Sequence, residues 1–511
     1  MVNLSYNTAV TSLQVYPTYE VYQEWSRHSK VVPISCEADA DMETPISLFK
    51  KFSAEKYCYL LESVEGGERW ARYSIMGRKP LVIFKSVKGK TVLTIQGEEK
   101  VFYDNPIRIL NDLLEQLKSK TFPHLPRFYG GVVGTFGYDM VRYYEDIEDN
   151  HRDDIALPDC HLIVPEEVVV FDHLKQKIHM IVNTIVKENF DDSEDNDRQD
   201  IYHESKEKIK NIFSEISSQH KHRQSVDSGK PAPDVHFTSS VSEEVFCRSV
   251  VKAKEYIKNG DIFQVVLSQR LKSAFEGDAF EVYRKLRTLN PSPYMYFLKY
   301  DDYAIAGASP EMLVRVEHET VETCPIAGTR PRGKTPQEDE RLADDLLSDA
   351  KELAEHTMLV DLGRNDIGKV CKFGSVVTQN MMHIEKYSHV MHMVTNVEGK
   401  QRGDKTPLDV LTAVLPAGTV SGAPKVRAME IIEELETVRR GIYAGAIGYI
   451  GFDGNLDTCI AIRTAIFKNQ SVYVQAGAGI VADSVPEKEY VETLNKAQAL
   501  ISAVKKARGH R

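Results

Sequence analysis

Four glutamates in two pairs are the side chains most suited to chemistry. Glu352 and Glu355 lie three residues apart among good helix formers, and Glu489 and Glu492 repeat this spacing near the C-terminus. Residues three apart share one helix face, so each helix would present two carboxylates together. Facing carboxylates repel unless a cation lies between them, and hard oxygen ligands with room for water suit Mg²⁺. The pattern indicates a magnesium site for an anionic substrate; two solvated helix faces are the alternative on spacing alone.

The second pair follows strong signals for the start of a helix. Ser484 can cap the helix, with Pro486 in the first turn and Glu487 at the third helical position of a capping box. Lys496 lies four residues after Glu492 and shares its face. We therefore expect a well-defined helix that carries the second carboxylate pair.

A nucleotide-binding loop is a competing interpretation of the region before the first pair. Residues 328–335 match the pattern G-x-x-x-x-G-K-[ST]. Such a loop presents consecutive backbone N–H groups and begins a helix at the lysine. Pro331 removes one N–H, and Pro336 stands where the helix should be under way. The carboxylate interpretation is favoured.

Segments between the two pairs could bind the anion. Small residues in 416–425 and in 475–480 let backbone N–H groups approach an anion near helix N-termini. Arg463 can hold a carboxylate through two hydrogen bonds. These features predict a pocket for a small polyanion bridged to a metal.

The overall composition is that of an ordinary globular protein. The chain has 511 residues, 42% hydrophobic and 27% charged, and a formal net charge of −11, which disfavours nucleic acid as a partner. No apolar run approaches the length of a membrane helix, and the first 25 residues lack the pattern of an export signal, so we expect a cytoplasmic protein with no membrane contact. Seven cysteines without a C-x-x-C pair argue against a disulfide framework and a zinc site.

The pattern of elements predicts an α+β fold of large antiparallel sheets flanked by helices. Short β-rich runs at 81–84, 91–95 and 167–171 and a helix near 106–118 occupy the first half, which we delimit as residues 1–235. Its last part, from about 187, is polar and is typical of a solvated helix tethered by flexible loops. The second domain, 236–511, opens with a helix over 242–259, ended by Gly260, and a strand over 262–270. Regular βαβα alternation is absent.

One internal similarity links the two halves. Residues 129–139 and 443–453 share a pattern of glycines at near-alternate positions. Glycines in a strand allow close approach of another backbone. The two stretches could be equivalent strands of related halves, or glycine-rich strands that arose separately.

Several long motifs resemble those of the chorismate-utilising enzymes. They are PIAGTRPRG, ELAEHTMLVDLGRND, LPAGTVSGAPK, IRTA and QAGAGIVADSVPEKEYVETLNKA, in this order and most densely between about 240 and 500. The resemblance implies the sandwich of antiparallel sheets typical of that family, a Mg²⁺ cofactor and a lyase that forms anthranilate and pyruvate from chorismate and ammonia. Aminodeoxychorismate synthase, isochorismate synthase and a non-catalytic small-molecule-binding regulator are the alternatives.

The resemblance also implies residue roles. Glu355 and Glu492 resemble Mg²⁺ ligands, with Glu352 and Glu489 beside them through water. The implied contacts to chorismate are Gly328, Thr329, Thr419, Tyr443, Arg463, Gly477, Ala478, Gly479 and Lys496. His392 resembles a histidine near the reacting ring. Loss of the C4 hydroxyl needs a proton, and Glu352 is our candidate general acid because neighbouring carboxylates would raise its pKa.

Two positions bear on the choice among sister activities. Members that make aminodeoxychorismate typically carry a nucleophilic lysine where this chain has Ala327, and those that add water carry a lysine base where it has Gln264. External ammonia is thus the consistent nucleophile, which selects the anthranilate-forming branch.

The resemblance implies regulation and a partner as well. Glu62 and Ser63 in one segment, with Pro293, Tyr294 and Met295 in another, resemble two halves of a tryptophan feedback site. No G-x-C-x-G stretch of a glutamine-hydrolysing domain is present, so a separate glutamine amidotransferase subunit would supply ammonia. We therefore expect a hetero-oligomer.

Overall fold

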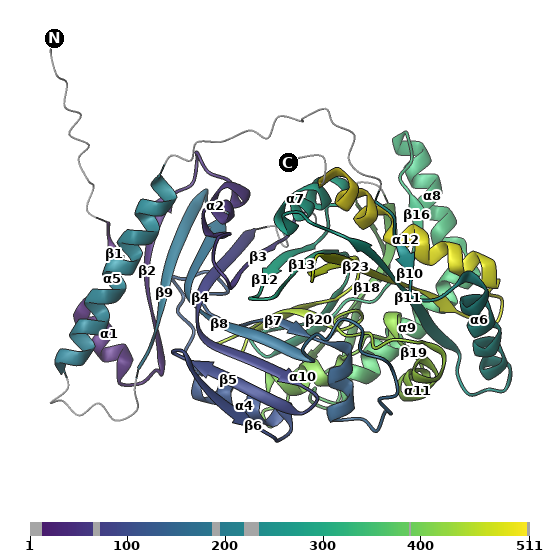
Figure 1. Ribbon diagram of the computed structural model, residues 1–511, viewed down its shortest axis with the longest axis horizontal. Coiled ribbons are helices and arrows are strands. Elements are labelled where there is room, and N and C mark those ends of the chain that lie inside the picture. Colours follow the sequence, from purple (N-terminus) through teal and green to yellow (C-terminus); the bar gives the residue numbers. More distant parts are fainter. Residues whose placement is uncertain (1–12, 65–71, 187–194, 219–234, 388–389, 508–511) are drawn as a thin grey trace, which may run out of the picture.

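The structure, a computed structural model, describes residues 13–64, 72–186, 195–218, 235–387 and 390–507. Within them, 23 strands are linked by backbone hydrogen bonds, and the pairings between these strands are antiparallel. Figure 1 shows the strands as a twisted sandwich with helices around it. The predicted fold class is confirmed.

Two long strands, β4 (Tyr73–Val87) and β8 (Cys160–Asp172), pair with each other, and one layer of the sandwich continues from each of them. The first layer runs from β4 through β3 (Cys58–Glu62), β12 (Tyr294–Lys299), β13 (Tyr303–Ser309), β22 (Thr464–Lys468) and β23 (Ser471–Ile480) to β11 (Gln264–Ala274). The second runs from β8 through β7 (Gly131–Phe136), β20 (Ala446–Gly451), β21 (Leu456–Ile460), β14 (Met312–Glu317) and β15 (Thr320–Thr323) to β18 (Val390–Lys400).

Shorter or peripheral strands complete the sheets. β16 (Ile326–Pro331) and β17 (Val377–Lys386) flank β18, while β19 (Gly422–Ala423) and β10 (Thr238–Ser239) pair with the two ends of β11. β5 (Lys90–Ile95) and β6 (Glu98–Phe102) extend one edge of β4, and β9 (Lys177–Ile185), β2 (Val31–Asp39) and β1 (Val15–Tyr16) extend β8.

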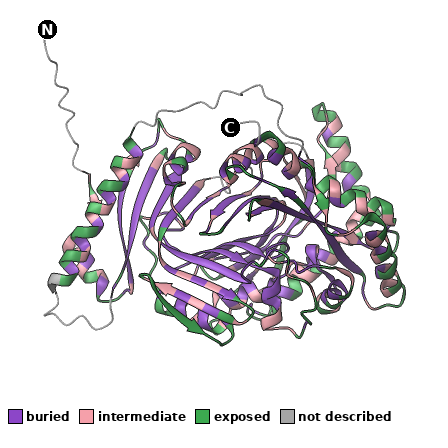
Figure 2. Cartoon of the chain, viewed as in Figure 1, coloured by how far each residue is buried: buried purple, intermediate pink, exposed green. Residues whose placement is uncertain are grey.

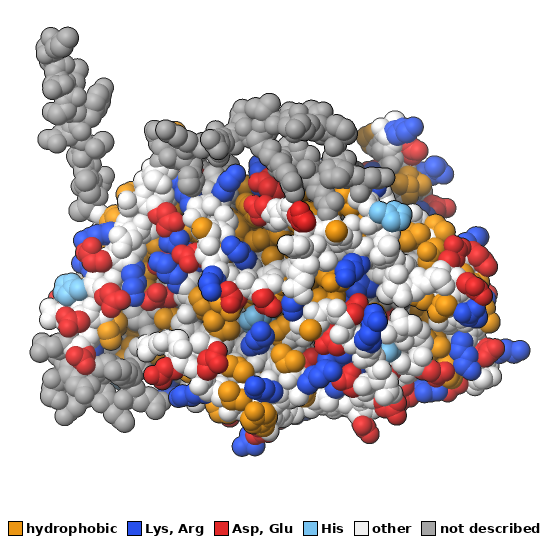
Figure 3. Space-filling view, viewed as in Figure 1, with side chains coloured by type: hydrophobic (Ala, Val, Ile, Leu, Met, Phe, Trp, Pro, Cys, Tyr) orange, Lys and Arg blue, Asp and Glu red, His pale blue; other side chains and the backbone are white. Residues whose placement is uncertain are grey.

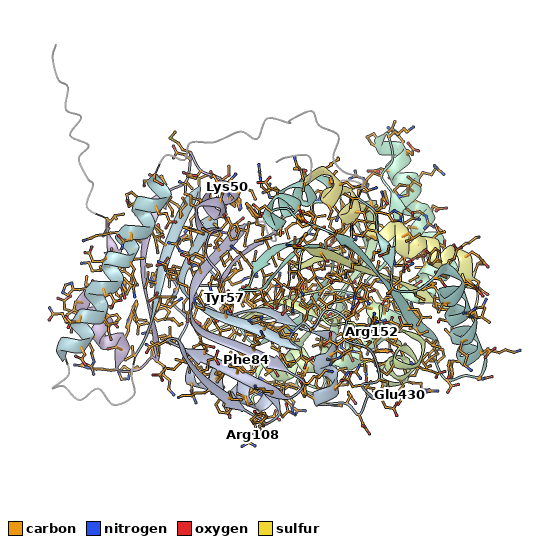
Figure 4. The ribbon with its side chains drawn as sticks, viewed as in Figure 1. Lys50, Tyr57, Phe84, Arg108, Arg152 and Glu430 are labelled. Atoms are coloured by element: carbon orange, nitrogen blue, oxygen red, sulfur yellow. The ribbon has the colours of Figure 1, made fainter. Side chains whose placement is uncertain are left out.

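The main core lies between the two layers. It joins Tyr296 and Ile305 of the first layer to Val314 and Ile447 of the second, all at most 1% exposed. Removal of such apolar surface from water provides most of the free energy that holds the layers together. Figure 2 shows buried residues along the inner strands, and Figure 4 shows side chains filling the space between the layers.

Helices cover the outer faces. α2 (Pro45–Phe52), α7 (Ala279–Leu289) and α12 (Pro486–Ala507) enclose a second core with the first layer, and α6 (Glu243–Lys258) and α11 (Lys425–Leu435) enclose a third with β11. The other helices are α1 (Tyr19–Ser26), α4 (Pro106–Gln116), α5 (Asp195–Ser217), α8 (Pro336–Ser348), α9 (Ala350–Gly368) and α10 (Pro407–Val414), with short 3₁₀ turns at η1 (Tyr138–Tyr143) and η3 (Gly418–Val420).

The predicted helices occur with small corrections. α6 is capped by Ser242, and Gly260 beyond its end has φ +85°. α12 begins one residue later than the predicted cap implies, because the carbonyl of Val485 accepts the N–H groups of Lys488 and Glu489. The Ser484 hydroxyl accepts the N–H of Val481.

The helix predicted to be a solvated excursion is packed against the sheet. In α5, Ile209 and Ile212 are fully buried, and Glu215 pairs with Arg78 of β4 at 2.7 Å. Ile209 and Ile212, three residues apart, give the helix an apolar face. The polar sequence on both sides of the helix had led us to predict a solvated one. The flanking stretches 187–194 and 219–234 lie outside the described residues.

The two similar glycine-rich stretches are neighbouring strands. β7 and β20 pair directly, with Gly134 opposite Gly448. An added Cβ would lie 2.1 Å from the carbonyl oxygen of His161 at the first glycine and of Asp457 at the second. Any side chain at these two positions would clash with the backbone of the adjacent strand, so only glycine fits.

The proposed boundary near residue 235 stays a prediction, and strands from its two sides are hydrogen-bonded in both layers, as β3 with β12 and β7 with β20. No helix in the described part of the chain is long and apolar enough to cross a membrane. On the face in Figure 3, positive and negative side chains are interspersed.

Candidate active site

A cavity of about 510 Å³ opens between β11 and β23 of the first layer and β16 and β18 of the second, and residues of α9 and α12 also line it. Of the candidate residues, its lining includes Gly328, Thr329, Glu352, Glu355, His392, Thr419, Tyr443, Arg463, Gly477, Gly479, Glu489, Glu492 and Lys496. Segments far apart in the sequence therefore meet in one place.

Helix α9 brings the first carboxylate pair to the cavity. Its cap is Asp349, which accepts the N–H groups of Lys351 and Glu352. Glu352 also lies 3.6 Å from the guanidinium of Arg330. Burial and then the charge of Glu352 raise the pKa of Glu355.

Helix α12 brings the second pair from the opposite side. Burial, and to a smaller degree the charge of Glu492, raises the pKa of Glu489. Glu492 pairs with Lys496 at 2.7 Å, and the Lys496 ammonium donates to the carbonyl of Gly477 at 3.1 Å. The helix is thereby tied to β23, which forms the wall of the cavity.

The donor set suits a divalent cation, although the side chains are not gathered around one point. Burial and mutual repulsion raise the pKa of two of the four carboxylates, and a hard cation would relieve that repulsion. In the chain as described, no three metal-ligating side chains form a preformed cluster.

Glu311 is a functional candidate that the sequence analysis missed. It follows β13, is 8% exposed, and accepts a hydrogen bond from Thr419 at 3.0 Å. Burial raises its pKa to about 8, against the opposing effects of Thr419, Arg463 and Lys496. A buried carboxyl with a raised pKa can hold a proton at a higher pH than an ordinary carboxyl, so Glu311 is a further candidate general acid besides Glu352. A single glutamate in a buried apolar run, ASPEMLV, was the signal available.

His392 is held in one orientation at the wall of the cavity. Its Nδ1 lies 3.0 Å from the carbonyl oxygen of Gly328 and 3.1 Å from the Thr329 hydroxyl. A ring nitrogen this close to a carbonyl carries the proton, which leaves Nε2 as an acceptor. Burial lowers the pKa of His392, so the neutral ring is favoured.

Two glycines of β23 shape the part of the cavity wall that this strand forms. An added Cβ at Gly477 would lie 2.6 Å from the Tyr443 hydroxyl, and one at Gly479 would lie 2.5 Å from the Gln264 side-chain nitrogen. Strand alternation turns the side chain of Ala478 away from the cavity into the core under α6 and α11, where it is fully buried, so the predicted contact of Ala478 with a ligand would be through its backbone. Its side chain is not a candidate contact for a ligand.

A second cavity, of about 420 Å³, lies between the layers near β3, β12 and β20. Its lining includes the five residues that resemble a tryptophan site, Glu62, Ser63, Pro293, Tyr294 and Met295. The Glu62 carboxylate, however, accepts hydrogen bonds from Tyr283 at 2.5 Å and Arg287 at 3.1 Å, both on α7. Its expected role as partner of an amino group is thus weakened, because its acceptors are already engaged.

Comparisons with known proteins show the family to which the chain belongs. The family model of chorismate binding enzymes matches residues 57–502, and the chain belongs to this family. An anthranilate synthase component 1 of Acetivibrio thermocellus is 55% identical over 96% of this chain and 99% of its own, and one of Aquifex aeolicus is 47% identical over 95% and 97%.

Solved structures show the same fold. The anthranilate synthase component I of Streptococcus pneumoniae superposes with a TM-score of 0.75 at 39% identity, over 91% of this chain and 98% of that one. An isochorismate synthase of Escherichia coli, at 18% identity, has a TM-score of 0.67 over 95% and 98% and supports the fold alone.

Proposed function

We propose that this chain is a lyase that converts chorismate and ammonia into anthranilate, pyruvate and water. The observation that carries the proposal is one cavity lined by two carboxylate pairs, Arg463 and the buried carboxyl of Glu311. One carboxylate of a dicarboxylate substrate would bind a cation held by the glutamates, and the other would pair with Arg463. The family membership and the names of the relatives point to the same reaction.

Glu355 and Glu492 would hold Mg²⁺, with Glu352 and Glu489 beside them. A bound Mg²⁺ supplies positive charge that fixes a substrate carboxylate in the cavity. Arg463 and the backbone around Gly328 orient the rest of the molecule.

Glu311 and His392 suit the two proton transfers. In the first step the ammonia lone pair forms a bond to C2, the ring double bonds shift, and the C4 oxygen leaves as water with the proton of Glu311. In the second step Nε2 of His392 takes the proton from C2 while the C3–oxygen bond breaks, which releases pyruvate and leaves an aromatic ring.

The chain would receive ammonia from a separate glutamine amidotransferase subunit, and tryptophan would inhibit it from the second cavity. That cavity offers aromatic walls in Tyr73 and Tyr449, which suit an indole. Arg72 and Arg127 also line it, but they already pair with Asp172 at 3.0 Å and Asp457 at 2.6 Å, so a ligand carboxylate would share these cations with the aspartates.

The proposal is tested by incubating the purified chain with chorismate, an ammonium salt and MgCl₂ while anthranilate fluorescence is followed. We expect fluorescence to rise, to stop when a chelator is added, and to resume with excess Mg²⁺. Consumption of chorismate without anthranilate would refute the proposal. Glutamine is expected to replace ammonium only when the partner subunit is added.

A further inference from the structure

A small cavity adjoins the candidate active site at Glu311. It has a volume of about 40 Å³, and we call it the side chamber. Glu311, Leu359 and Thr419 line both the side chamber and the cavity of the two glutamate pairs. Of these three residues, only Glu311 carries an ionisable side chain. Its carboxyl therefore lies in the wall that the two spaces share.

The side chamber has the size and the polarity to hold water. A buried water needs about 10–15 Å³ of space and two to four polar partners. Besides Glu311 and Thr419, the wall contains the hydroxyl of Thr323 and the carboxylate of Asp366. Thr323 donates its proton to the carbonyl of Leu313 at 2.9 Å, and Thr419 donates to Glu311 at 3.0 Å, so both hydroxyl oxygens can still accept a hydrogen bond. At least one water molecule therefore fits there.

Asp366 connects the chamber wall to the protein surface. It lies in the last turn of α9 and is 4% exposed. Its carboxylate pairs with the ammonium group of Lys425 at 2.6 Å and with that of Lys369 at 3.4 Å. The Lys369 side chain is 52% exposed. A path of polar groups thus leads from solvent at Lys369 through Asp366 to the side chamber.

The proposed reaction needs a way to return a proton to Glu311. When the C4 oxygen leaves as water, Glu311 becomes a carboxylate, and it must regain a proton before the next turnover. Substrate or product occupies the larger cavity during that time, whereas the side chamber stays open to Glu311.

We infer that water in the side chamber returns this proton from Asp366 to Glu311, an inference that rests on the proposed function. Asp366 takes a proton from solvent and passes it to the chamber water, and that water gives one of its own protons to Glu311. Each transfer breaks one O–H bond and forms another. One proton enters per turnover by this route, and the ammonium group formed at C2 releases one to solvent, so the charge balances. Asp366 is thus a proton-relay residue that acts through Glu311.

The test removes the relay while it leaves Glu311 in place. The main variant is Asp366→Asn combined with Lys425→Met, because Lys425, whose side chain is 12% exposed, would otherwise lose its ion-pair partner. Asp361→Asn is the matched control, since Asp361 lies on the same helix, has a side chain that is 78% exposed and pairs with Arg364. Anthranilate formation from chorismate and an ammonium salt with MgCl₂ is followed by rapid mixing, first with the protein in excess and then with chorismate in excess.

The relay affects only turnovers after the first. In a single turnover Glu311 uses the proton that it holds at the start, so that rate should change less than about threefold, whereas the steady-state rate should fall about tenfold or more. The steady-state rate of the variant should also fall further in D₂O than that of wild type, since a proton transfer from water then limits turnover. In a Glu311→Gln background the same substitutions should cause no further loss.

The outcomes separate this inference from the proposed function. Equal losses in the single-turnover and steady-state rates would overturn the inference, because they indicate a distorted site. Unchanged steady-state turnover in the variant, or an Asp361→Asn protein slowed to the same degree, would overturn it as well. Wild-type protein that forms no anthranilate would instead refute the proposed function. Thermal melting identifies folded variants, and Asp366→Asn alone takes the place of the double variant if the latter does not fold.

Discussion

Replacing Glu311 with glutamine should produce opposite effects on activity and on stability. The amide has nearly the same shape and can still accept the Thr419 hydrogen bond, but it has no acidic proton. Loss of a general acid lowers turnover by about 10² to 10⁴-fold. Stability should change in the other direction at alkaline pH.

The size of the stability effect follows from the pKa of the buried carboxyl. At about 1.36 kcal/mol per pKa unit, the interval between the ordinary 4.5 and the raised value of about 8 corresponds to about 5 kcal/mol. Below the ordinary value both folded and unfolded chains hold the proton, so Glu311 causes no pH-dependent loss. As pH rises toward 8 the unfolded chain ionises while the folded chain does not, so the wild type loses stability that Glu311→Gln does not lose.

The free energy of unfolding of wild type and variant is measured with denaturant at about pH 5 and about pH 8.5. Initial rates of anthranilate formation are measured separately at constant free ammonia. We expect the variant to gain several kcal/mol relative to wild type between the two pH values, and the wild-type rate to fall as pH passes about 8. A stability difference that is the same at both pH values, or a variant with full activity, would refute the assignment of Glu311 as a buried acid.

Three further variants test the other parts of the site. Glu355→Ala should raise the Mg²⁺ concentration for half-maximal activity by at least about tenfold, since a carboxylate of α9 is lost; an unchanged Mg²⁺ titration would exclude it as a ligand. Gly477→Ala places a methyl 2.6 Å from the Tyr443 hydroxyl and should raise the KM for chorismate about tenfold through overpacking of about 1–3 kcal/mol, with normal kinetics as the contrary result. Ser63→Phe should fill part of the second cavity and weaken tryptophan binding, measured by calorimetry, about tenfold or more; wild-type affinity would remove Ser63 from the site.

Local sequence patterns predicted the parts of the site that depend on one element. The spacing of the two glutamate pairs follows from helix periodicity alone, and α9 and α12 present both pairs to one cavity. The helix over 243–258 and the glycine that follows it were likewise predicted from neighbouring residues alone. Prolines 331 and 336 correctly weakened the nucleotide interpretation: the N–H of Gly333 donates to Asp339 at 2.6 Å, so the loop binds the chain's own carboxylate.

Features that depend on distant partners could not be predicted in this way. The engagement of Glu62 arises from Tyr283 and Arg287, more than 200 residues later in the chain. The raised pKa of Glu311 comes from burial between layers that no local pattern reports.

The most direct test of the account follows the nitrogen atom. Chorismate is converted by the purified chain with ¹⁵N-labelled ammonium and Mg²⁺, and anthranilate and pyruvate are quantified together, the first by mass spectrometry and the second with lactate dehydrogenase. The account predicts one labelled nitrogen in each anthranilate and equal amounts of the two products. Pyruvate released with an unlabelled or hydroxylated ring, or an aminated product that retains its pyruvyl group, would contradict it.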